Sequence, residues 1–328
     1  CWIRLKRVNL HHFSSNLHGH PLNSRCINYL GISGSIQKPT MNSEETLAPA
    51  QFEQWIGRSE SSHEVLTLAP MVAMAATLDK QDLACETGSV MPPLWHWLYF
   101  LDPAPQSKLA NDGHAERGDF LPPIALPRRM WAGSRFEFLH CLHAGEAISR
   151  QSTIKSIELK DGRSGKLAFV CVRHEISNTR GLAIKEEHDI VFRQHTPVDA
   201  PPPTAVAAPS DCDYSRMIDA DSVLLFRYSA LTFNGHRIHY DRDYATREEG
   251  YPGLIVHGPL LATLLVELLG VTHPDRTIKT FQFKSVAPVF DLNSFHVCGV
   301  DPDQNGETQL WVKDHEGSLC MKGAALVE

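Results

Sequence analysis

Two stretches of the chain repeat one order of hydrophobic patterns. Each begins with a short helical pattern, over residues 66–79 and 220–234, in which apolar residues recur three or four positions apart. Each continues with a glycine-led apolar segment, over residues 88–103 and 250–270, which predicts a buried helix that starts near a proline. The shared order predicts an internal repeat.

Alternating apolar and polar residues follow each predicted helix, as in half-buried antiparallel strands. The segments with this pattern are 135–160, 166–178 and 182–193 in the first half, with a hairpin turn over 161–165, and 278–290, 293–303, 308–318 and 319–327 in the second half. An antiparallel sheet wrapped around one long apolar helix satisfies this order. Two copies in one chain predict an α+β fold of the double hotdog type.

Residues 197–209 predict a stiff extended linker, because five of these thirteen residues are proline. The linker separates a predicted N-terminal degenerate hotdog over 41–196 from a predicted C-terminal catalytic hotdog over 210–328. Within the first half, residues 102–126 are rich in Pro, Gly and Asp, and we interpret them as a long surface loop.

Residues 1–40 carry five Lys or Arg and no acidic residue, and the first methionine is Met41. Two interpretations stay open for this leader: a mitochondrial transit peptide, or non-native upstream sequence. The first places the protein in mitochondria, and the second is compatible with a bacterial cytoplasm. Either way the leader is not expected to belong to the fold.

The overall composition is that of an ordinary globular protein, with 42% hydrophobic residues and a formal net charge of −7. This charge argues against a nucleic-acid partner. The most apolar stretch, residues 253–271, is interrupted by His257, Pro259 and Glu267, so it does not predict a membrane span.

Candidate chemistry is concentrated between residues 226 and 265. Asn234-Gly235 is a strong turn signal, and several titratable side chains share the same short loop: His236, His239, Asp241 and Asp243. A predicted helix then begins near Gly258, where an unpaired backbone N–H favours developing negative charge. Acid–base groups beside such an oxyanion site suit chemistry that passes through an enolate.

The segments FNGHRIHYD (233–241) and GYPGLIVHGPL (250–260) resemble the hydratase 2 motif of the MaoC-like enoyl-CoA hydratases. The resemblance is strongest to the double-hotdog branch that includes mitochondrial hydroxyacyl-thioester dehydratases and bacterial mesaconyl-CoA and itaconyl-CoA hydratases. In the first half it extends to PPLWHWLYFLDP (92–103) and RRMWAGSRFEF (128–138).

The resemblance implies a cofactor-independent hydro-lyase that acts on an acyl-CoA or acyl-carrier-protein thioester. It makes His239 the acid–base residue and Gly258 the amide that binds the thioester oxygen. Asn234 stands where the wider family has an acid, so it either orients water through its amide or only shapes the turn. A short branched dicarboxylic acyl group is the preferred substrate, a 3-hydroxyacyl thioester of fatty acid synthesis the alternative, and the first half is expected to be catalytically silent.

Four further residues are candidates for binding substrate: Arg129, Trp131, His257 and Lys284. For the basic ones, an exposed surface role is the simpler interpretation. His236 and His239 also have a spacing that can hold a metal, but no third ligand is evident nearby, so we predict no metal site. Asp241 either orients a histidine or is solvated.

Two other functions remain open on the sequence. A hotdog thioesterase would need a carboxylate or nucleophile on the long helix, where Glu267 lies well beyond the helix start. A non-catalytic thioester-binding protein would have no need of an acid–base histidine. A homodimer is possible but not required, because two hotdogs in one chain can pair with each other.

Overall fold

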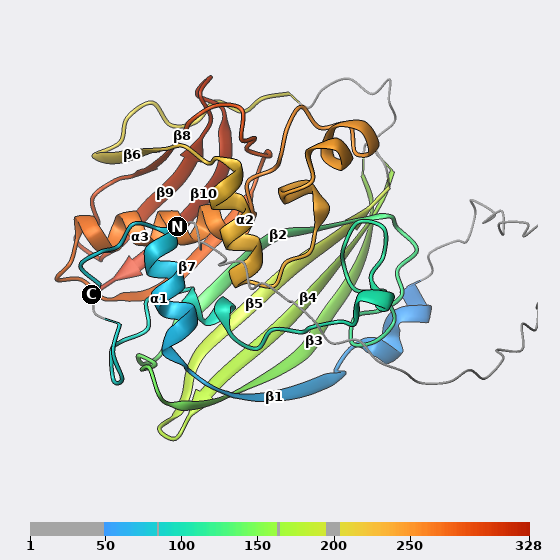
Figure 1. The fold of residues 1–328 in the computed structure, drawn as a ribbon, viewed down its shortest axis with the longest axis horizontal. Helices are drawn as coiled ribbons and strands as arrows, with labels where there is room; N and C mark the ends of the chain where they lie inside the picture. Colours follow the sequence, from blue (N-terminus) through green and yellow to red (C-terminus); the bar gives the residue numbers. More distant parts are fainter. Residues whose placement is uncertain (1–48, 84, 163–164, 195–203) are drawn as a thin grey trace, which may run out of the picture. The chain divides into compact units, whose positions relative to one another are not determined.

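The computed structural model describes residues 49–83, 85–162, 165–194 and 204–328 (Figure 1). The predicted leader, residues 1–40, lies outside the described residues, as do residues 197–203 of the predicted linker. At the end of that linker, Ala207 pairs with Ser318 as an isolated bridge.

Ten strands in the described residues form one antiparallel sheet, in the order β1-β3-β4-β5-β2-β7-β10-β9-β8-β6. Their bounds are β1 (Ser59–Val65), β2 (Arg128–Phe138), β3 (Ala147–Gly162), β4 (Gly165–Asn178), β5 (Gly181–Arg193), β6 (Tyr214–Ile218), β7 (Ile278–Ser285), β8 (Phe295–Gly299), β9 (Glu307–Lys313) and β10 (Leu319–Val327). The first five strands and the last five follow the same order, read from opposite edges. This arrangement confirms the internal repeat.

The two sets of strands meet where β2 pairs with β7, with Gly133 opposite Lys284 and Phe136 opposite Phe281. A Cβ atom at Gly133 would lie 2.3 Å from the carbonyl oxygen of Phe283. A side chain at this position would therefore push the strands apart, which explains the glycine. The sheet continues across both predicted hotdogs, and their boundaries in the chain stay a prediction.

Most predicted strands are confirmed within a few residues. The segment 135–160 is an exception, because it contains the end of β2, a loop over 139–146 and most of β3. The predicted hairpin turn is confirmed by the pairing of Gly162 with Gly165, which closes β3 against β4.

In the second half, both predicted helices are confirmed as α2 (Ser222–Leu231) and α3 (Gly258–Thr272). Helix α3 packs against the strands of its half. Its buried residues are Leu260, Leu261, Ala262, Thr263, Leu264, Leu265, Val266, Leu268 and Leu269. Each large side chain of this kind contributes about 1.5–3 kcal/mol on burial, so α3 is the centre of the C-terminal core.

In the first half, the short predicted helix is confirmed as α1 (Leu68–Thr77), but the long helix predicted over 88–103 is wrong. Only a short 3₁₀ helix, η2 (Trp95–Leu98), forms there. Prolines at 92, 93 and 103 leave too few residues for a stable α-helix. Leu94 and Phe100, on either side of η2, also have left-handed backbone angles, with φ of 69° and 54°.

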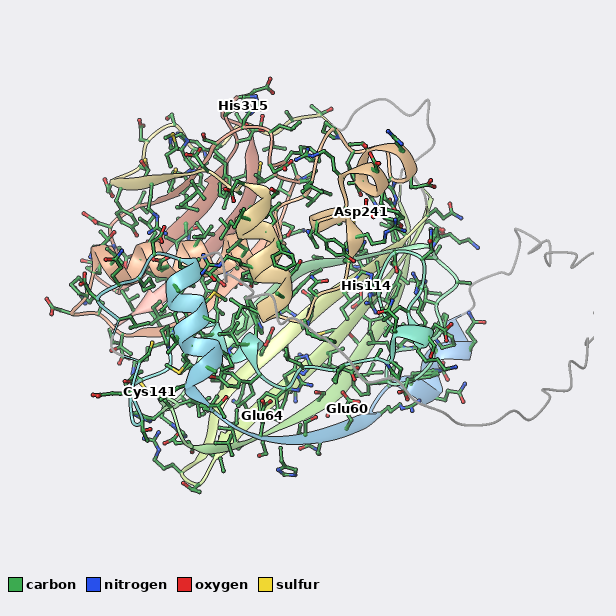
Figure 2. All side chains as sticks on the ribbon, viewed as in Figure 1. Glu60, Glu64, His114, Cys141, Asp241 and His315 are labelled. Carbon is green, nitrogen blue, oxygen red and sulfur yellow. The ribbon has the colours of Figure 1, made fainter. Side chains whose placement is uncertain are left out.

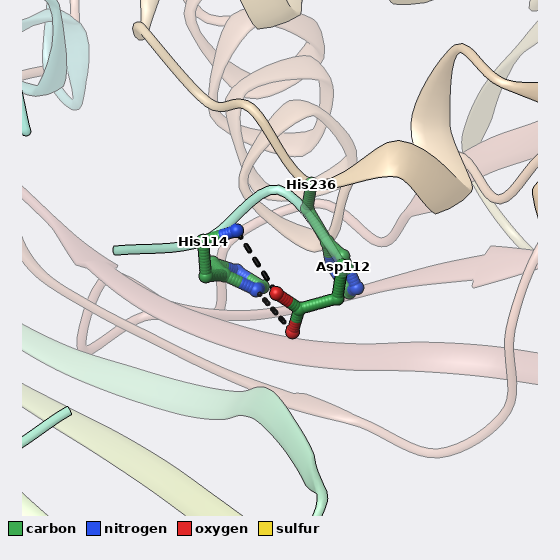
Figure 3. Close-up of side chains that lie close together, drawn as sticks. All are labelled: Asp112, His114 and His236. Carbon is green, nitrogen blue, oxygen red and sulfur yellow. Dashed lines mark hydrogen bonds and ion pairs between the residues drawn. The ribbon is translucent and has the colours of Figure 1, made fainter. Parts of the chain in front are cut away.

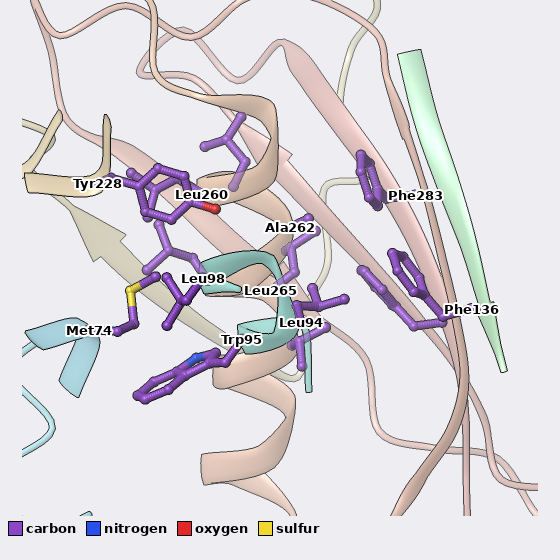
Figure 4. Close-up of a cluster of buried hydrophobic side chains, with 14 of the residues drawn as sticks. Met74, Leu94, Trp95, Leu98, Phe136, Tyr228, Leu260, Ala262, Leu265 and Phe283 are labelled. Carbon is purple, nitrogen blue, oxygen red and sulfur yellow. The ribbon is translucent and has the colours of Figure 1, made fainter. Parts of the chain in front are cut away.

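One hydrophobic core joins the two halves (Figure 4). It brings together buried side chains from α1, η2, β2, α2, α3 and β7, among them Met74, Trp95, Phe136, Tyr228, Leu265 and Phe283. Helices α1 and α2 lie against each other. A smaller cluster packs the 3₁₀ helix η1 (Pro49–Trp55) on β3, β4 and β5 through Phe52.

The long loop over 102–126 contains one short 3₁₀ helix, η3 (Gln106–Lys108), and a tight turn closed by a bridge between Leu109 and Ala115. Two more short helices follow α2: η4 (Arg237–His239) and the π-helix η5 (Tyr244–Glu248). Within the described part of the chain, no helix has the length and apolar character needed to cross a membrane.

Candidate active site

His239 ends the short helix η4, and one hydrogen bond decides which of its nitrogens carries the proton. Its Nδ1 lies 2.7 Å from the backbone oxygen of Ile255. Because a carbonyl oxygen can only accept, Nδ1 must donate, and the lone pair of the neutral ring is on Nε2. His239 is therefore prepared to accept a proton at Nε2.

The ring of His239 stacks on the ring of His257, with centroids 3.8 Å apart and planes 18° apart. Burial, and the positive charge that His114 can carry, lower the pKa of His239 to about 4, although the bond to Ile255 acts in the opposite sense. His239 is thus neutral near pH 7, which is the state required of a general base.

His257 is fully buried. Its Nε2 lies 2.8 Å from the Ser229 hydroxyl of α2, and its Nδ1 has no hydrogen-bond partner among the described residues. Burial and the neighbouring histidines keep the pKa of His257 well below its usual value. The His257 ring therefore packs against His239, and its predicted part in substrate binding stays a prediction.

Gly258 follows His257 as the first residue of α3, and Pro259 comes next. The first N–H groups of a helix have no partner inside the helix. The contact between His239 and His257 therefore brings an acid–base imidazole to a helix start that can stabilise negative charge. The structure thus places His239 against the residue that directly precedes Gly258, the other predicted catalytic group.

Asn234 shapes the turn between α2 and η4. Its side-chain oxygen accepts a hydrogen bond of 3.0 Å from the backbone N–H of His236. Its own N–H donates to the Ser229 oxygen at 2.8 Å. These contacts support the turn interpretation, and they leave the side-chain amide nitrogen as the group for water or substrate.

The long loop of the first half reaches this site, a contact that the sequence patterns did not predict. The backbone N–H of Arg237 donates to the backbone oxygen of Asp112 at 2.9 Å. The Arg237 side chain donates to the backbone oxygen of Asn111 at 3.0 Å. Figure 2 labels His114 from this loop and Asp241 from the segment after η4. An Asp-Gly-His sequence in a turn was the available signal, but nothing in the sequence linked it to residues 234–241.

Asp112 and His114 form a closed pair beside His236 (Figure 3). One carboxylate oxygen accepts a hydrogen bond of 3.0 Å from the backbone N–H of His114. The other carboxylate oxygen lies 3.0 Å from Nδ1 of the same histidine. The rings of His114 and His236 are 4.1 Å apart between centroids. Burial tends to raise the pKa of Asp112, but the bonds to His114 hold it well below its usual range.

Asp112, His114 and His236 are also close enough to be considered as metal ligands, since their ligand atoms all lie within 4.8 Å of one another. Two observations argue against this use. Both oxygens of Asp112 already accept hydrogen bonds from His114. The positive charge of Arg129 acts on His114 and His236, so a second cation there would be opposed. His239, whose spacing from His236 is compatible with metal binding, is not part of this cluster.

Arg129 and Trp131 share one face of β2. Among the described residues, the Arg129 side chain has no hydrogen bond or ion pair, and burial lowers its pKa. Trp131 stacks on His188 at 3.8 Å and lies 4.9 Å from Trp97, between ring centroids. Arg129 thus brings a positive charge close to the histidine cluster, and Trp131 belongs to an aromatic cluster with Trp97 and His188.

A buried carboxylate holds part of this aromatic cluster. Glu186 accepts hydrogen bonds from Trp97 Nε1 at 3.2 Å and Ser134 Oγ at 3.3 Å, and its carboxylate lies 3.1 Å from His96 Nε2. Burial alone would raise the pKa of Glu186, but the bond to His96 and the nearby histidines bring it to about 2. The Glu186 carboxylate is therefore ionised near neutral pH, and its hydrogen bond to Nε1 positions the Trp97 ring.

Two predicted residues are not brought to the site. Lys284 is exposed on β7, next to buried Phe283 along the strand, so it lies on the opposite face of the sheet. The Asp241 carboxylate binds the Arg237 guanidinium at 2.8 and 3.0 Å and does not orient a histidine.

A hollow of about 340 Å³ lies elsewhere, over β1, β3 and β4, and is lined by Ser61, His63, Ser149, Arg150, Gln151, Glu175, Ser177 and Leu182. It includes none of the residues around His239, so it is not the candidate site.

Comparison with solved structures supports the double hotdog fold. A MaoC-like dehydratase from Phytophthora capsici aligns with a TM-score of 0.59 at 15% identity, covering 83% of this chain and 96% of that one. A Mycobacterium tuberculosis protein described as a double hotdog fold aligns with a TM-score of 0.53 at 14% identity, with the same coverages.

Sequence comparison identifies the family. A Chloroflexus aurantiacus mesaconyl-C(4)-CoA hydratase is 50% identical over 76% of this chain and 89% of its own length. The mitochondrial hydroxyacyl-thioester dehydratase type 2 of Schizosaccharomyces pombe is 27% identical over 72% of this chain and 88% of its own length. The family model for hydroxyacyl-thioester dehydratase type 2 matches residues 94–291. This chain therefore belongs to the hydroxyacyl-thioester dehydratase type 2 family.

Proposed function

We propose that this protein is a hydro-lyase that adds water reversibly across the α,β double bond of an acyl-CoA thioester. The observation that carries the proposal is the state of His239. Its Nδ1 donates to the Ile255 oxygen, which leaves the lone pair on Nε2, and its ring stacks on His257, the residue before α3. The named relatives, which are hydratases and dehydratases of thioesters, agree with this chemistry.

In the proposed reaction, the thioester oxygen accepts a hydrogen bond from the Gly258 N–H. His239 Nε2 removes a proton from water as the water oxygen bonds to the β-carbon. The electron pair of the double bond moves toward the thioester, and the helix start stabilises the resulting enolate oxygen. The imidazolium of His239 then returns a proton to the α-carbon, so no proton is gained or lost overall.

Asn234 has a supporting part in this proposal. Its side-chain oxygen is bound by the His236 N–H, so only its amide nitrogen can donate to the attacking water. No cofactor is needed, because the thioester itself makes the α-proton acidic.

A dicarboxylic acyl group of the mesaconyl type is our preferred substrate. Arg129 is a partly buried guanidinium with no hydrogen bond or ion pair among the described residues, and its charge reaches His114 and His236. A carboxylate of the substrate would form an ion pair with Arg129, because a guanidinium binds a carboxylate through two hydrogen bonds. Trp131, on the same face of β2, would contact the acyl chain.

Arg129 can be tested by comparing two substrates. We expect Arg129→Gln to raise the KM for a dicarboxylic enoyl-CoA by at least about tenfold, the loss of one charge-assisted contact. The KM for a short enoyl-CoA without the second carboxylate should change little. Equal effects on both substrates would contradict a carboxylate-binding role.

The thioesterase alternative finds little support. Glu267, the carboxylate on α3, is occupied by two ion pairs, with Arg216 at 3.0 Å and Lys80 at 3.3 Å. A 3-hydroxyacyl thioester of fatty acid synthesis, a carrier-protein thioester, a homodimer and the cellular compartment stay predictions.

One assay separates the candidate functions. Ultraviolet absorbance of the enoyl-thioester band is followed beside release of free thiol. A hydro-lyase removes the band without releasing thiol, a thioesterase releases thiol, and a binding protein does neither. Retention of the band with mesaconyl-type and unbranched enoyl-CoA substrates alike would overturn the proposal.

A further inference from the structure

The backbone of the loop at residues 111–114 lies in close contact with the backbone of the segment that holds His239, at Gly235. A Cβ atom at Gly113 would lie 1.9 Å from the Gly235 oxygen, and one at Gly235 would lie 2.7 Å from the Gly113 oxygen. Gly113 also has a φ of +89°, which side chains rarely tolerate. Two glycines thus allow the first half of the chain to bring Asp112 and His114 to the site.

Four imidazole rings form a continuous row from this loop to the start of α3. The ring centroids of His114 and His236 are 4.1 Å apart, those of His236 and His239 are 5.4 Å apart, and those of His239 and His257 are 3.8 Å apart. A charge on one ring is therefore felt by the next.

Only one ring of this row has a carboxylate partner in the described residues. The Asp112 carboxylate lies 3.0 Å from His114 Nδ1, whereas the Nδ1 of His239 faces a backbone carbonyl and the Nε2 of His257 faces the hydroxyl of Ser229. Because an anion stabilises an imidazolium, a proton that enters the row is most stable on His114.

Other charged groups near the row raise or lower the pKa values of its histidines. Arg129 and Arg117 lower the pKa of His114, while Asp112 raises it, and burial gives a net lowering. The charge of His114 in turn lowers the pKa of His239 and of His236. Arg117 is held by the backbone oxygens of Ile124 and Pro127, at 2.7 Å each.

We infer that Asp112 and His114 are a positioning pair, contributed by the first half of the chain, that takes up the proton entering the row and so keeps His239 neutral. This inference rests on the proposed function, because it assigns His239 the task of accepting a proton from water. It also means that the first half is not catalytically silent. The pair exchanges no proton with the substrate, so the proton balance of the reaction is unchanged.

The pH profile of Asp112→Asn tests the pair, with Asp119→Asn as the control. Asp119 is an exposed aspartate of the same loop. Without the carboxylate, the proton held by His114 moves to His239, so the acid limb of kcat/KM should move up by about one pH unit. Because the limb then moves from about pH 4 to about pH 5, the loss should be about fivefold at pH 4 and less than about twofold above pH 5. The control should follow the wild-type profile.

A second variant keeps the test decisive if Asp112→Asn does not fold. His114→Gln removes the ring that takes the proton, and the exposed His63→Gln is its control. We expect the same upward movement of the acid limb. A merely structural role would lower the rate equally at every pH, and a loss independent of pH would overturn the inference, as would a wild-type profile in a folded variant.

Titration of histidine ring protons by NMR, without substrate, separates this inference from the proposed function. In the wild type His114 should take up a proton at higher pH than His239, and in Asp112→Asn the pKa of His114 should fall and that of His239 rise. If the wild type hydrates no enoyl thioester, the proposed function fails, yet this titration still tests the pair. An unchanged His239 titration in both variants would overturn the pair.

Discussion

The imidazole of His239 lies flat on the imidazole of His257, with ring centroids 3.8 Å apart. Two positive rings at this distance would repel each other, so the stack is stable only when at least one ring is neutral. Burial also disfavours the charged form of both rings, so His239 stays neutral, with the Nε2 lone pair available to accept a proton.

His239→Ala should abolish activity without unfolding the protein. The substitution removes the only lone pair assigned to the water proton, and loss of a general acid–base group costs about 10²–10⁴-fold in rate. The hydration rate and the melting temperature should be measured together. Turnover close to the wild-type rate would show that another group carries the proton.

Ser229→Ala should destabilise the protein through His257. The substitution leaves His257 Nε2 buried without its partner at 2.8 Å, and an unsatisfied buried polar group costs about 1–3 kcal/mol. Urea denaturation measures the change in the free energy of unfolding. Ser222→Ala, an exposed site on the same helix, is the control, and an equal effect in both variants would contradict this role.

Asn234→Asp should keep the turn but lower the rate. A carboxylate can still accept the bond from the His236 N–H, so the fold is retained. It cannot donate to water, and its charge would stabilise protonated His239 and raise the pKa of that ring. The pH optimum should therefore move upward. An unchanged rate and pH profile would assign Asn234 to the turn alone.

Gly113→Ala should destabilise the fold more than Gly118→Ala. Both glycines have positive φ, +89° and +105°, so both substitutions carry a backbone strain of about 1–3 kcal/mol. Only at Gly113 does the new Cβ collide with a backbone oxygen, whereas at Gly118 the nearest atom lies 3.8 Å away. Activity should fall with Gly113→Ala alone. Matching melting temperatures for the two variants would contradict the close contact with Gly235.

Buried neutral histidines should make stability depend on pH. Burial lowers the pKa of His174 to about 3, below the value of about 6.5 expected in the unfolded chain. Between these values the unfolded state binds more protons, so stability falls as pH decreases from 6.5. His174→Asn should reduce the proton uptake on unfolding near pH 5 by about one proton, measured from the slope of unfolding free energy against pH.

The control for this slope is His63→Asn, which changes an exposed histidine of β1. Its slope should match that of the wild type. An identical slope in His174→Asn would mean that this ring is not held neutral in the folded protein.

Local patterns in the sequence determined the antiparallel strands, helices α1, α2 and α3, and the segment that holds His239 and Gly258. Those features depend on periodicity and on residues close together in the chain, so the sequence displays them directly. The helix predicted over 88–103 failed for a local reason as well, because the prolines that suit a helix start also left too short a segment between them.

Only the tertiary structure decided how the site is completed. The Ile255 carbonyl selects the tautomer of His239, the Ser229 hydroxyl holds His257 beneath it, and the loop of the first half brings Asp112 and His114 to His236. Each of these contacts joins residues that are separated in the chain, and the contact of the first-half loop also depends on the close backbone approach of Gly113 and Gly235. Hydrophobic periodicity does not predict such contacts. It shows which face of a helix or strand is buried, and it does not show which distant segment covers that face.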